Sequence, residues 1–292
     1  MTRLKENDID RIVYQMEAYN QELLSRTGHS LAEIAAHAVG IKQVDETGLR
    51  DLGPIAVIPM TCGQGVIGGF SATVVGILTF LGVAAFVTDS ADIKGFAEAM
   101  GRKANVLFMA DDDRFIAANL KTGQYSDNSE ATGKGYVAAL DYMTGGLKER
   151  SVLIVGAGPV GIAAASSVLD FGGKVYVYDK NGEASGKLAR YMLAHRGQRI
   201  AIETDLNSAL ISHRFIVDAC PEEGFISLEH LCSDSYVAAP GVPLGIHAKA
   251  LSRIQTRLIH DPLQLGVATM LYDIVNDSLE RNLSGRLEEG SK

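Results

Sequence analysis

One glycine-rich turn constrains this chain more than any other feature. Residues 156–161 read GAGPVG and follow the apolar run SVLIV at residues 151–155. Apolar residues at helical spacing come next, and a second apolar run ends at Asp179. A strand, a glycine turn, a helix, a strand and an acid in this order are typical of a βαβ unit that binds a dinucleotide. The sequence therefore predicts a Rossmann dinucleotide-binding domain.

The glycines of the turn have separate physical roles. Gly156 permits the tight turn, Gly158 lets the backbone approach a pyrophosphate, and Gly161 lets the helix pack closely on the strand. The helix is expected to begin after Gly158, at Pro159 and Val160, so that its N-terminus presents a positive dipole to the phosphates. We expect all five residues to bind the cofactor.

The acid and the later strand ends complete the predicted cofactor site. Asp179 lies near the usual spacing of about 20 residues for a carboxylate that accepts a hydrogen bond from a ribose hydroxyl. Because a carboxylate repels a 2′-phosphate, we predict NAD rather than NADP. In open parallel sheets, ligands bind beyond the carboxyl ends of the strands. The further cofactor-binding residues that we predict, at strand ends and in the last helix, are Cys220, Pro221, Pro240, Gly241, Gly266 and Thr269.

Composition and charge narrow the class of protein. The 292 residues are 47% hydrophobic and 21% charged, which suits two α/β domains with separate cores. The net charge of −8 disfavours nucleic acid and anionic membrane surfaces as partners. The three cysteines show no pairing or metal-binding pattern, which is typical of a reducing cytoplasm. We expect a cytoplasmic protein, and association into a homo-oligomer stays open.

One uncharged segment requires a separate test for a membrane span. Residues 52–88 carry no charged side chain and are long enough to cross a bilayer. Pro54, Pro59 and a glycine loop at residues 61–65 interrupt the segment. Because buried parallel strands and their helices also form continuous apolar runs, we interpret the segment as a soluble core.

The order of elements predicts N-terminal helices and a small parallel α/β domain ahead of the Rossmann domain. Strand and helix patterns alternate from residue 55 onward, which favours a parallel sheet. The polar residues 121–134 are expected to separate the domains. The predicted division is residues 1–125 for the substrate domain, 126–276 for the NAD-binding domain and 277–292 for a flexible polar tail. We expect helices at 7–25, 30–39, 93–102, 135–147 and 262–275, and strands at 55–59, 84–88, 106–110, 199–202, 215–218, 236–238 and 257–260.

Asp111 is the strongest candidate for a catalytic group. It follows the predicted strand 106–110 directly, so its side chain projects from a rigid strand end. A carboxylate there can hold and deprotonate an amine, and an amine loses hydride from its adjacent carbon only when the nitrogen lone pair is free. The alternative is that Asp111, Asp112 and Asp113 cap a helix starting near Arg114. Alternating ligands and a closing acid are absent, so we predict no metal site. His260, at another strand end, is a weaker acid/base candidate.

Three segments resemble one family of enzymes. They read IPMTCGQGVIGGFS at residues 58–71, MADDDRFIAANLK at 109–121 and PLQLGVATMLY at 262–272. In this order, around the same glycine turn, they are similar to the pyrrolysine-biosynthesis dehydrogenase, the last enzyme of that pathway. One departure is Cys62-Gly63-Gln64-Gly65, where that family has Ser-Gly-Asn-Gly. A thiol donates hydrogen bonds weakly, so the resemblance implies contact rather than a polar role for Cys62.

The resemblance implies a reaction and a set of substrate contacts. The implied reaction is NAD-dependent oxidation of 3-methyl-D-ornithyl-Nε-L-lysine, a small dipeptide-like substrate, with loss of ammonia and ring closure to pyrrolysine. Asp111 would hold the reacting amine, Thr61, Cys62 and Phe70 would line the substrate site, and Leu4 would close over the ligand. Two alternatives stay open. They are an NAD-dependent dehydrogenase of another amino-acid-like substrate, for which a Lys–Asp pair is expected and no lysine is seen at a first-domain strand end, and a non-catalytic NAD-binding sensor.

Overall fold

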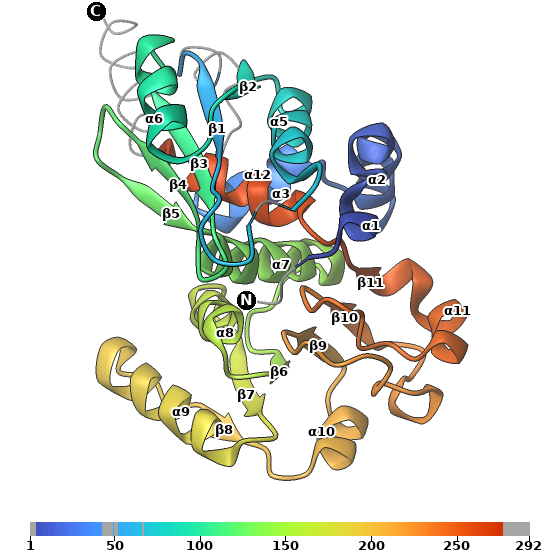
Figure 1. Ribbon diagram of the computed structural model, residues 1–292. Coiled ribbons are helices and arrows are strands. Elements are labelled where there is room, and N and C mark those ends of the chain that lie inside the picture. The colour runs from blue at the N-terminus through green and yellow to red at the C-terminus, as the bar shows by residue number, and fades with distance from the viewer. Residues whose placement is uncertain (1–3, 43–48, 50–51, 66, 277–292) are drawn as a thin grey trace, which may run out of the picture.

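The computed structural model describes residues 4–42, 49, 52–65 and 67–276, and the tail predicted at 277–292 lies outside this part of the chain. Two sheets lie on either side of a long helix (Figure 1). We call the first sheet with the helices around it the first lobe, and the second sheet with its helices the second lobe. The predicted α/β class, with a Rossmann-type sheet in the second lobe, is confirmed.

The sheet of the first lobe is mixed. Its strand order is β2-β1-β3-β4-β5, and the three strands predicted from the sequence, β1, β2 and β3, are parallel. The two further strands, β4 and β5, continue the sheet as an antiparallel hairpin. The strands are β1 Ile55–Pro59, β2 Ala85–Val87, β3 Val106–Ala110, β4 Phe115–Asn119 and β5 Tyr125–Asp127.

The hairpin corrects one interpretation of the three consecutive aspartates. No helix begins near Arg114, because the chain turns back directly into β4. Burial alternates along β4, with Phe115 and Ala117 facing the core, which is the period of two of a strand. The segment 121–134, predicted as a boundary, contains β5 and the first turns of the long helix.

The second lobe contains a parallel six-stranded sheet in the order β11-β10-β9-β6-β7-β8. Its strands and helices alternate along the chain, although α9, α10 and α11 had not been predicted. Each predicted strand is present within two residues of its expected bounds. The strands are β6 Ser151–Val155, β7 Lys174–Tyr178, β8 Ala201–Ile202, β9 Phe215–Asp218, β10 Tyr236–Ala238 and β11 Leu258–Ile259. The helices are α8 Pro159–Asp170, α9 Gly182–Arg196, α10 Leu206–Ser212 and α11 Leu251–Ile254.

The N-terminal helices cover the first lobe. The first predicted helix is divided in two near Asp10, and the second begins at a capping box formed by Ser30 and Glu33. In that box Ser30 Oγ accepts from the amide of Glu33, and Glu33 Oε2 accepts from the amide of Ser30 at 2.7 Å, which lowers the pKa of Glu33. The helices of this lobe are α1 Glu6–Ile9, α2 Ile12–Thr27, α3 Leu31–Ala38, α5 Phe70–Phe80 and α6 Asp92–Gly101.

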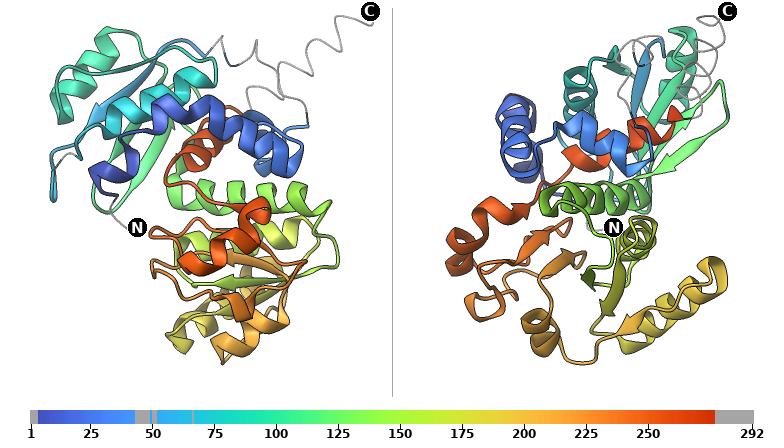
Figure 2. Two further views of the ribbon diagram at one scale, coloured as in Figure 1. Left: turned by 90° about the vertical axis from the view of Figure 1, so that its right-hand side faces the viewer. Right: turned by 180° about the vertical axis from the view of Figure 1, so that it is seen from behind.

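A long helix, α7 (Asn128–Thr144), runs between the lobes in every view (Figures 1 and 2). Glycines on α7 allow close approach on two sides. A Cβ on Gly133 would lie 2.6 Å from the Val160 carbonyl oxygen of α8, and one on Gly135 would lie 2.5 Å from Thr269 Oγ1 of α12 (Gln264–Asp273). Helix α12, the last predicted helix, packs against α3, α5 and α7, and therefore returns the chain to the first lobe.

A buried carboxylate joins α2, α7 and the start of α12. Asp261 Oδ2 accepts from the Tyr19 hydroxyl at 2.6 Å and lies 2.9 Å from the Tyr136 hydroxyl, while Oδ1 accepts from the amides of Leu263 and Leu265. The Tyr136 hydroxyl also accepts from the Asp261 amide at 2.8 Å. Burial and the adjacent carboxylate raise the pKa of both tyrosines well above their usual value, so both remain neutral donors.

Among the helices that the structure describes, none combines the length and the apolar character that crossing a bilayer requires.

Replacing Tyr136 by Phe should destabilise the protein through this network. The substitution removes both hydrogen-bonding roles of the hydroxyl and leaves the buried Asp261 amide without that acceptor, which should cost about 1–3 kcal/mol of unfolding free energy. Tyr142→Phe, on the same helix but half-buried, is the matched control and should change it by less than about 0.5 kcal/mol. Urea unfolding of the two variants measures the difference, and equal effects would contradict the assignment.

Candidate active site

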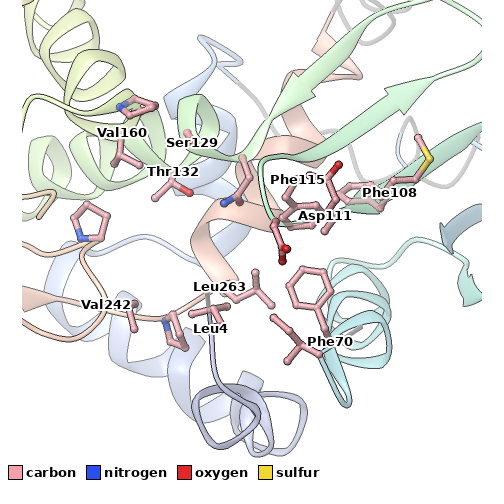
Figure 3. Close-up of a pocket in the computed structure, with 18 of the residues that line it drawn as sticks. Leu4, Phe70, Phe108, Asp111, Phe115, Ser129, Thr132, Val160, Val242 and Leu263 are labelled. Carbon is pink, nitrogen blue, oxygen red and sulfur yellow. The ribbon is translucent and has the colours of Figure 1, made fainter. Parts of the chain in front are cut away.

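A cavity of about 420 Å³ lies between the lobes, a size typical of small-molecule sites. The first lobe contributes the carboxyl ends of β1 and β3 and the start of α5, and the second lobe contributes the glycine turn before α8. The loops after β9, β10 and β11 and the start of α7 complete the wall. The strand ends of the two lobes therefore face each other across a cleft (Figure 3).

Asp111 lines this cavity at the end of β3. Its Oδ1 accepts from the backbone amides of Asp113 at 2.8 Å and Arg114 at 2.7 Å, which fixes the tight turn into β4. The carboxylate points into the cavity, toward the space between Phe70 and Leu263 (Figure 3). Within the described residues, the hydrogen bonds that hold the turn use only Oδ1 of Asp111. Oδ2 therefore remains available to a ligand. Asp111 thus holds the turn into β4 with one oxygen and keeps an accessible carboxylate oxygen at the cavity.

The electrostatic character of the cavity is acidic. Asp111 and Asp112 are its charged lining residues, and no lysine or arginine is among the described residues that line it. Most of the remaining wall is apolar, including Phe70, Phe108 and Phe115. A carboxylate beside apolar rings favours a ligand that carries an ammonium group on an aliphatic chain.

Two carboxylates hold the glycine loop that follows β1. Asp112 Oδ2 accepts from the Gln64 amide at 2.6 Å, and a Cβ on Gly63 would lie only 2.1 Å from the same oxygen. On the other side, Asp92 accepts from the amide of Thr61 at 2.8 Å and from its hydroxyl, and these bonds lower the pKa of Asp92. The loop is therefore anchored at both ends.

The substrate-binding residues predicted in the first lobe divide into two pairs. Leu4 and Phe70 line the cavity, and the Phe70 ring packs edge-on against Phe115 with centroids 5.2 Å apart. Thr61 and Cys62 are exposed and do not line it, contrary to expectation. The hydroxyl of Thr61 donates to Asp92, and the loop lines the cavity again at Gly65.

Three lining residues on α7 were missed from the sequence. Asn128, Ser129 and Thr132 bring polar side chains from the first turns of the helix to the cavity. The available signal was Asp127, whose side chain caps the helix by accepting from the Ser129 amide at 2.9 Å. An Asp two residues before a Ser in a polar segment could have marked a helix start rather than a domain boundary.

The glycine turn has the geometry that a pyrophosphate requires. Gly156 has a φ of +103°, and a Cβ on Gly161 would lie 1.9 Å from the Gly156 carbonyl oxygen, so both positions require glycine. No atom lies within 4 Å of a Cβ built on Gly158, which leaves the N-terminus of α8 open to a ligand. Gly158, Pro159 and Val160 line the cavity. The residues present therefore fit a dinucleotide phosphate at this helix N-terminus.

Asp179 lies beside the turn, at the end of β7. Its Oδ2 accepts from the Ala157 amide at 2.8 Å, and its Oδ1 accepts from the Asn181 amide at 2.8 Å. It supports the glycine turn and does not line the cavity itself. Its role toward a ribose stays a prediction.

The remaining predicted cofactor residues differ in position. Cys220, Pro221, Pro240 and Gly241 line the cavity from the loops after β9 and β10. Burial and the adjacent Asp218 carboxylate raise the pKa of the Cys220 thiol well above its usual value, so it is an uncharged contact.

Gly266 and Thr269 do not line the cavity, and their role in binding the cofactor stays a prediction. They lie in the contact between α7 and α12, where Thr269 is fully buried and donates to the Leu265 carbonyl at 2.8 Å. His260 also lies outside the lining, with Nδ1 at 2.8 Å from the Ala239 carbonyl oxygen. That contact supports a structural role for the ring.

Sequence comparison relates the chain to known proteins. The profile of the N-terminal domain of pyrrolysine biosynthesis protein PylD matches residues 8–126. The chain is 30% identical to the pyrrolysine synthase of Methanosarcina barkeri over 276 residues, which cover 94% of this chain and 98% of that protein. The chain belongs to the PylD family. The pyrrolysine synthase of Methanosarcina acetivorans is 29% identical, with 94% of this chain and all of that protein covered.

Solved structures share the fold of this PylD family member. Quinate dehydrogenase from Corynebacterium glutamicum in complex with NAD aligns with a TM-score of 0.51 at 17% identity, covering 77% of this chain and 94% of that one. Shikimate dehydrogenase from Aquifex aeolicus aligns with a TM-score of 0.50 at 16% identity, covering 80% and 95%. At these identities the likeness establishes the two-lobed α/β architecture.

Gly161→Ala should deform the turn at the start of α8. The added methyl group would overlap the Gly156 carbonyl oxygen, and the forced shift should lower the unfolding free energy by about 1–3 kcal/mol. Gly182→Ala is the matched control, since Gly182 also lies in the first turn of a helix of this lobe and has no atom within 4 Å of a Cβ. Thermal unfolding compares the two variants, and a loss in the control as large as that at position 161 would contradict the packing argument.

Proposed function

We propose that this chain is an NAD-dependent dehydrogenase that forms pyrrolysine. The substrate is 3-methyl-D-ornithyl-Nε-L-lysine, and the carbon that bears the terminal amine of its ornithyl part is oxidised. Loss of ammonia and attack by the ornithyl α-amine then close the five-membered imine ring. The observation that carries the proposal is the Asp111 carboxylate, which points into a cavity bounded on its other side by a dinucleotide-type glycine turn. Membership of the PylD family supports it.

Asp111 binds the reacting amine and accepts its proton. Oδ2 receives a hydrogen bond from the substrate ammonium group, while the two turn amides hold the carboxylate in place through Oδ1. Once deprotonated, the nitrogen uses its lone pair to support the departure of hydride from the adjacent carbon. A positioned base of this kind contributes about 10²–10⁴ in rate.

The apolar walls and the second lobe orient the reactants. Phe70, Phe108 and Phe115 exclude water around the alkyl chain of the substrate, so that the contact between ammonium and carboxylate is strong. Leu4, which lines the same cavity, closes it from the N-terminal segment. Gly158 and the start of α8 hold the pyrophosphate, and the bound nicotinamide supplies the acceptor for the hydrogen and two electrons that leave the substrate.

NAD is the cofactor rather than NADP. Asp179, beside the glycine turn, places a negative charge where the adenosine ribose of a dinucleotide on this turn would lie. The neighbouring cation, Lys180, is already paired with Glu222. A 2′-phosphate would therefore meet repulsion without a compensating cation.

The direct test is incubation of the purified protein with the dipeptide and NAD. Formation of NADH, followed by absorbance, together with a cyclised product identified by mass spectrometry, is the expected result. Binding of NAD with no turnover would support a sensor instead, and turnover of another amino acid alone would assign a different substrate.

Asp111→Asn should lower turnover by at least about tenfold, because an amide cannot accept the ammonium proton. Binding of NAD, measured separately by fluorescence titration of NADH, should persist. Asp113→Asn is the matched control, since Asp113 belongs to the same turn but does not line the cavity. Equal loss in both variants, or full activity in Asp111→Asn, would reject the role of Asp111.

The wild-type protein should bind NAD more tightly than NADP by roughly tenfold or more, because the phosphate meets the Asp179 carboxylate. Asp179→Ser should narrow this ratio by removing the charge. Asp205→Ser removes an exposed acid that caps α10 in the same lobe and should leave the ratio unchanged. Calorimetric titration of each protein with both dinucleotides measures the ratios, and equal affinities in the wild type would contradict the cofactor assignment.

A further inference from the structure

Asp218 is a buried carboxylate that has no part in the proposed reaction. It ends β9 and is fully buried, with a relative exposure of 0%. Its hydrogen bonds come from Cys220 and Gly245, and no cation pairs with it among the described residues. Burying a charge without a partner of opposite sign costs free energy. A side chain kept at such a cost requires a physical explanation.

The contacts of Asp218 join two loops. Oδ1 accepts from the amide and the thiol of Cys220, both at 3.3 Å, and Oδ2 accepts from the amide of Gly245 at 3.1 Å. The carbonyl oxygen of Asp218 also accepts from the Gly241 amide at 3.0 Å. Cys220 belongs to the loop after β9, while Gly241 and Gly245 belong to the loop after β10.

Both loops form the wall of the cavity beside the glycine turn. The lining includes residues 219–221 of the first loop and residues 240–242 of the second, and Figure 3 labels Val242 on this wall. Asp218 is not itself a lining residue. It lies behind the wall, at the point where the two loops meet.

Two glycines give the loops the space to approach each other. A Cβ on Gly245 would lie 2.1 Å from Asp218 Oδ2 and 2.5 Å from the Phe225 ring. A Cβ on Gly241 would lie 2.2 Å from the Cys220 carbonyl oxygen. The absence of a side chain at Gly241 and at Gly245 thus allows the two loops to pack closely around Asp218.

An ionised carboxylate is the group that this arrangement requires. The Cys220 amide, the Cys220 thiol and the Gly245 amide are all donors, and an ionised Asp is an acceptor on both of its oxygens. An asparagine would turn an NH₂ group toward one of the two loops. We propose that ionised Asp218 is a positioning residue, which joins the loops after β9 and β10 into the cofactor-facing wall of the cavity. The inference rests on the proposed function, which binds a dinucleotide at the glycine turn beside this wall.

The energetic consequence has a definite sign. Burial raises the pKa of Asp218 from its ordinary 3.8 to about 6, and the hydrogen bonds from Cys220 and Gly245 offset this only in part. The ionised form of an acid with a raised pKa destabilises the folded protein. This destabilisation is absent below pH 3.8, grows between pH 3.8 and about 6, and is complete above that. A shift of this size corresponds to roughly 100-fold in the unfolding equilibrium constant.

Among the described groups that contact Asp218, only Asp218 itself is expected to change its charge between pH 4 and pH 8. Cys220 is the titratable side chain in contact with it, and its raised pKa keeps it neutral. Val155 pairs with it from β6, the amide of Gly245 donates to it from the loop after β10, and the Phe225 ring lies beside Gly245.

Asp218→Asn, an isosteric change, should separate stability from cofactor binding. At pH 8 the variant should unfold at a higher temperature than the wild type, because the buried charge is gone, and the difference should shrink as the pH falls from 6 to 4. Its dissociation constant for NADH at pH 8, from fluorescence titration, should rise about tenfold because one loop loses its acceptor. The affinity of the wild type should fall toward that of the variant below pH 6, while the variant shows no such step.

Two control variants and four contrary outcomes complete the test. Asp205→Asn, at an exposed helix cap of the same lobe, should change neither the unfolding temperature nor the NADH affinity. Asp111→Asn should keep the pH step in NADH affinity. A variant at position 218 that unfolds more easily at pH 8, fails to fold, or binds NADH as tightly as the wild type would overturn the inference alone. A wild-type protein that binds no dinucleotide would overturn the proposed function and the inference with it.

Discussion

The hydrogen bonds of Asp261 join segments that are far apart in the sequence. Tyr19 from α2 and Tyr136 from α7 contact the carboxylate, and two amides at the start of α12 complete its shell. Pro262 and Leu263 follow directly and line the cavity. The position of this part of the wall therefore depends on a buried carboxylate whose partners, among the described residues, are hydrogen-bond donors, which makes each donor costly to remove.

Helix α7 connects this network to the two lobes. Gly133 allows contact with α8 of the second lobe, and Gly135 allows contact with α12 of the first. The N-terminal turns of the same helix present polar side chains to the cavity. A single helix thus sets the separation of the lobes and contributes to the site that they enclose, so substitutions that alter its packing should also alter the site.

Carboxylates near the cavity have different roles because their surroundings differ. Asp111 uses one oxygen for its own turn and directs the other to the cavity, whereas Asp112 and Asp92 hold the glycine loop after β1. Asp218 is buried and joins two loops behind the opposite wall. In each case the local donors, rather than the residue type, decide whether the carboxylate faces a ligand or supports the backbone.

The sequence by itself determined the elements whose signal is local. The glycine turn, the parallel strands and the strand-end position of Asp111 were predictable because hydrophobic period and turn chemistry act between near neighbours. Only the tertiary structure decided the hairpin after Asp113, since the apolar residues of β4 suit a helix until β3 is there to pair with them. It likewise decided the position of Thr269, in a helix contact, and of Asn128, in the cavity. Contacts between segments more than a hundred residues apart leave no periodic trace in the chain, and the site is made where such segments meet.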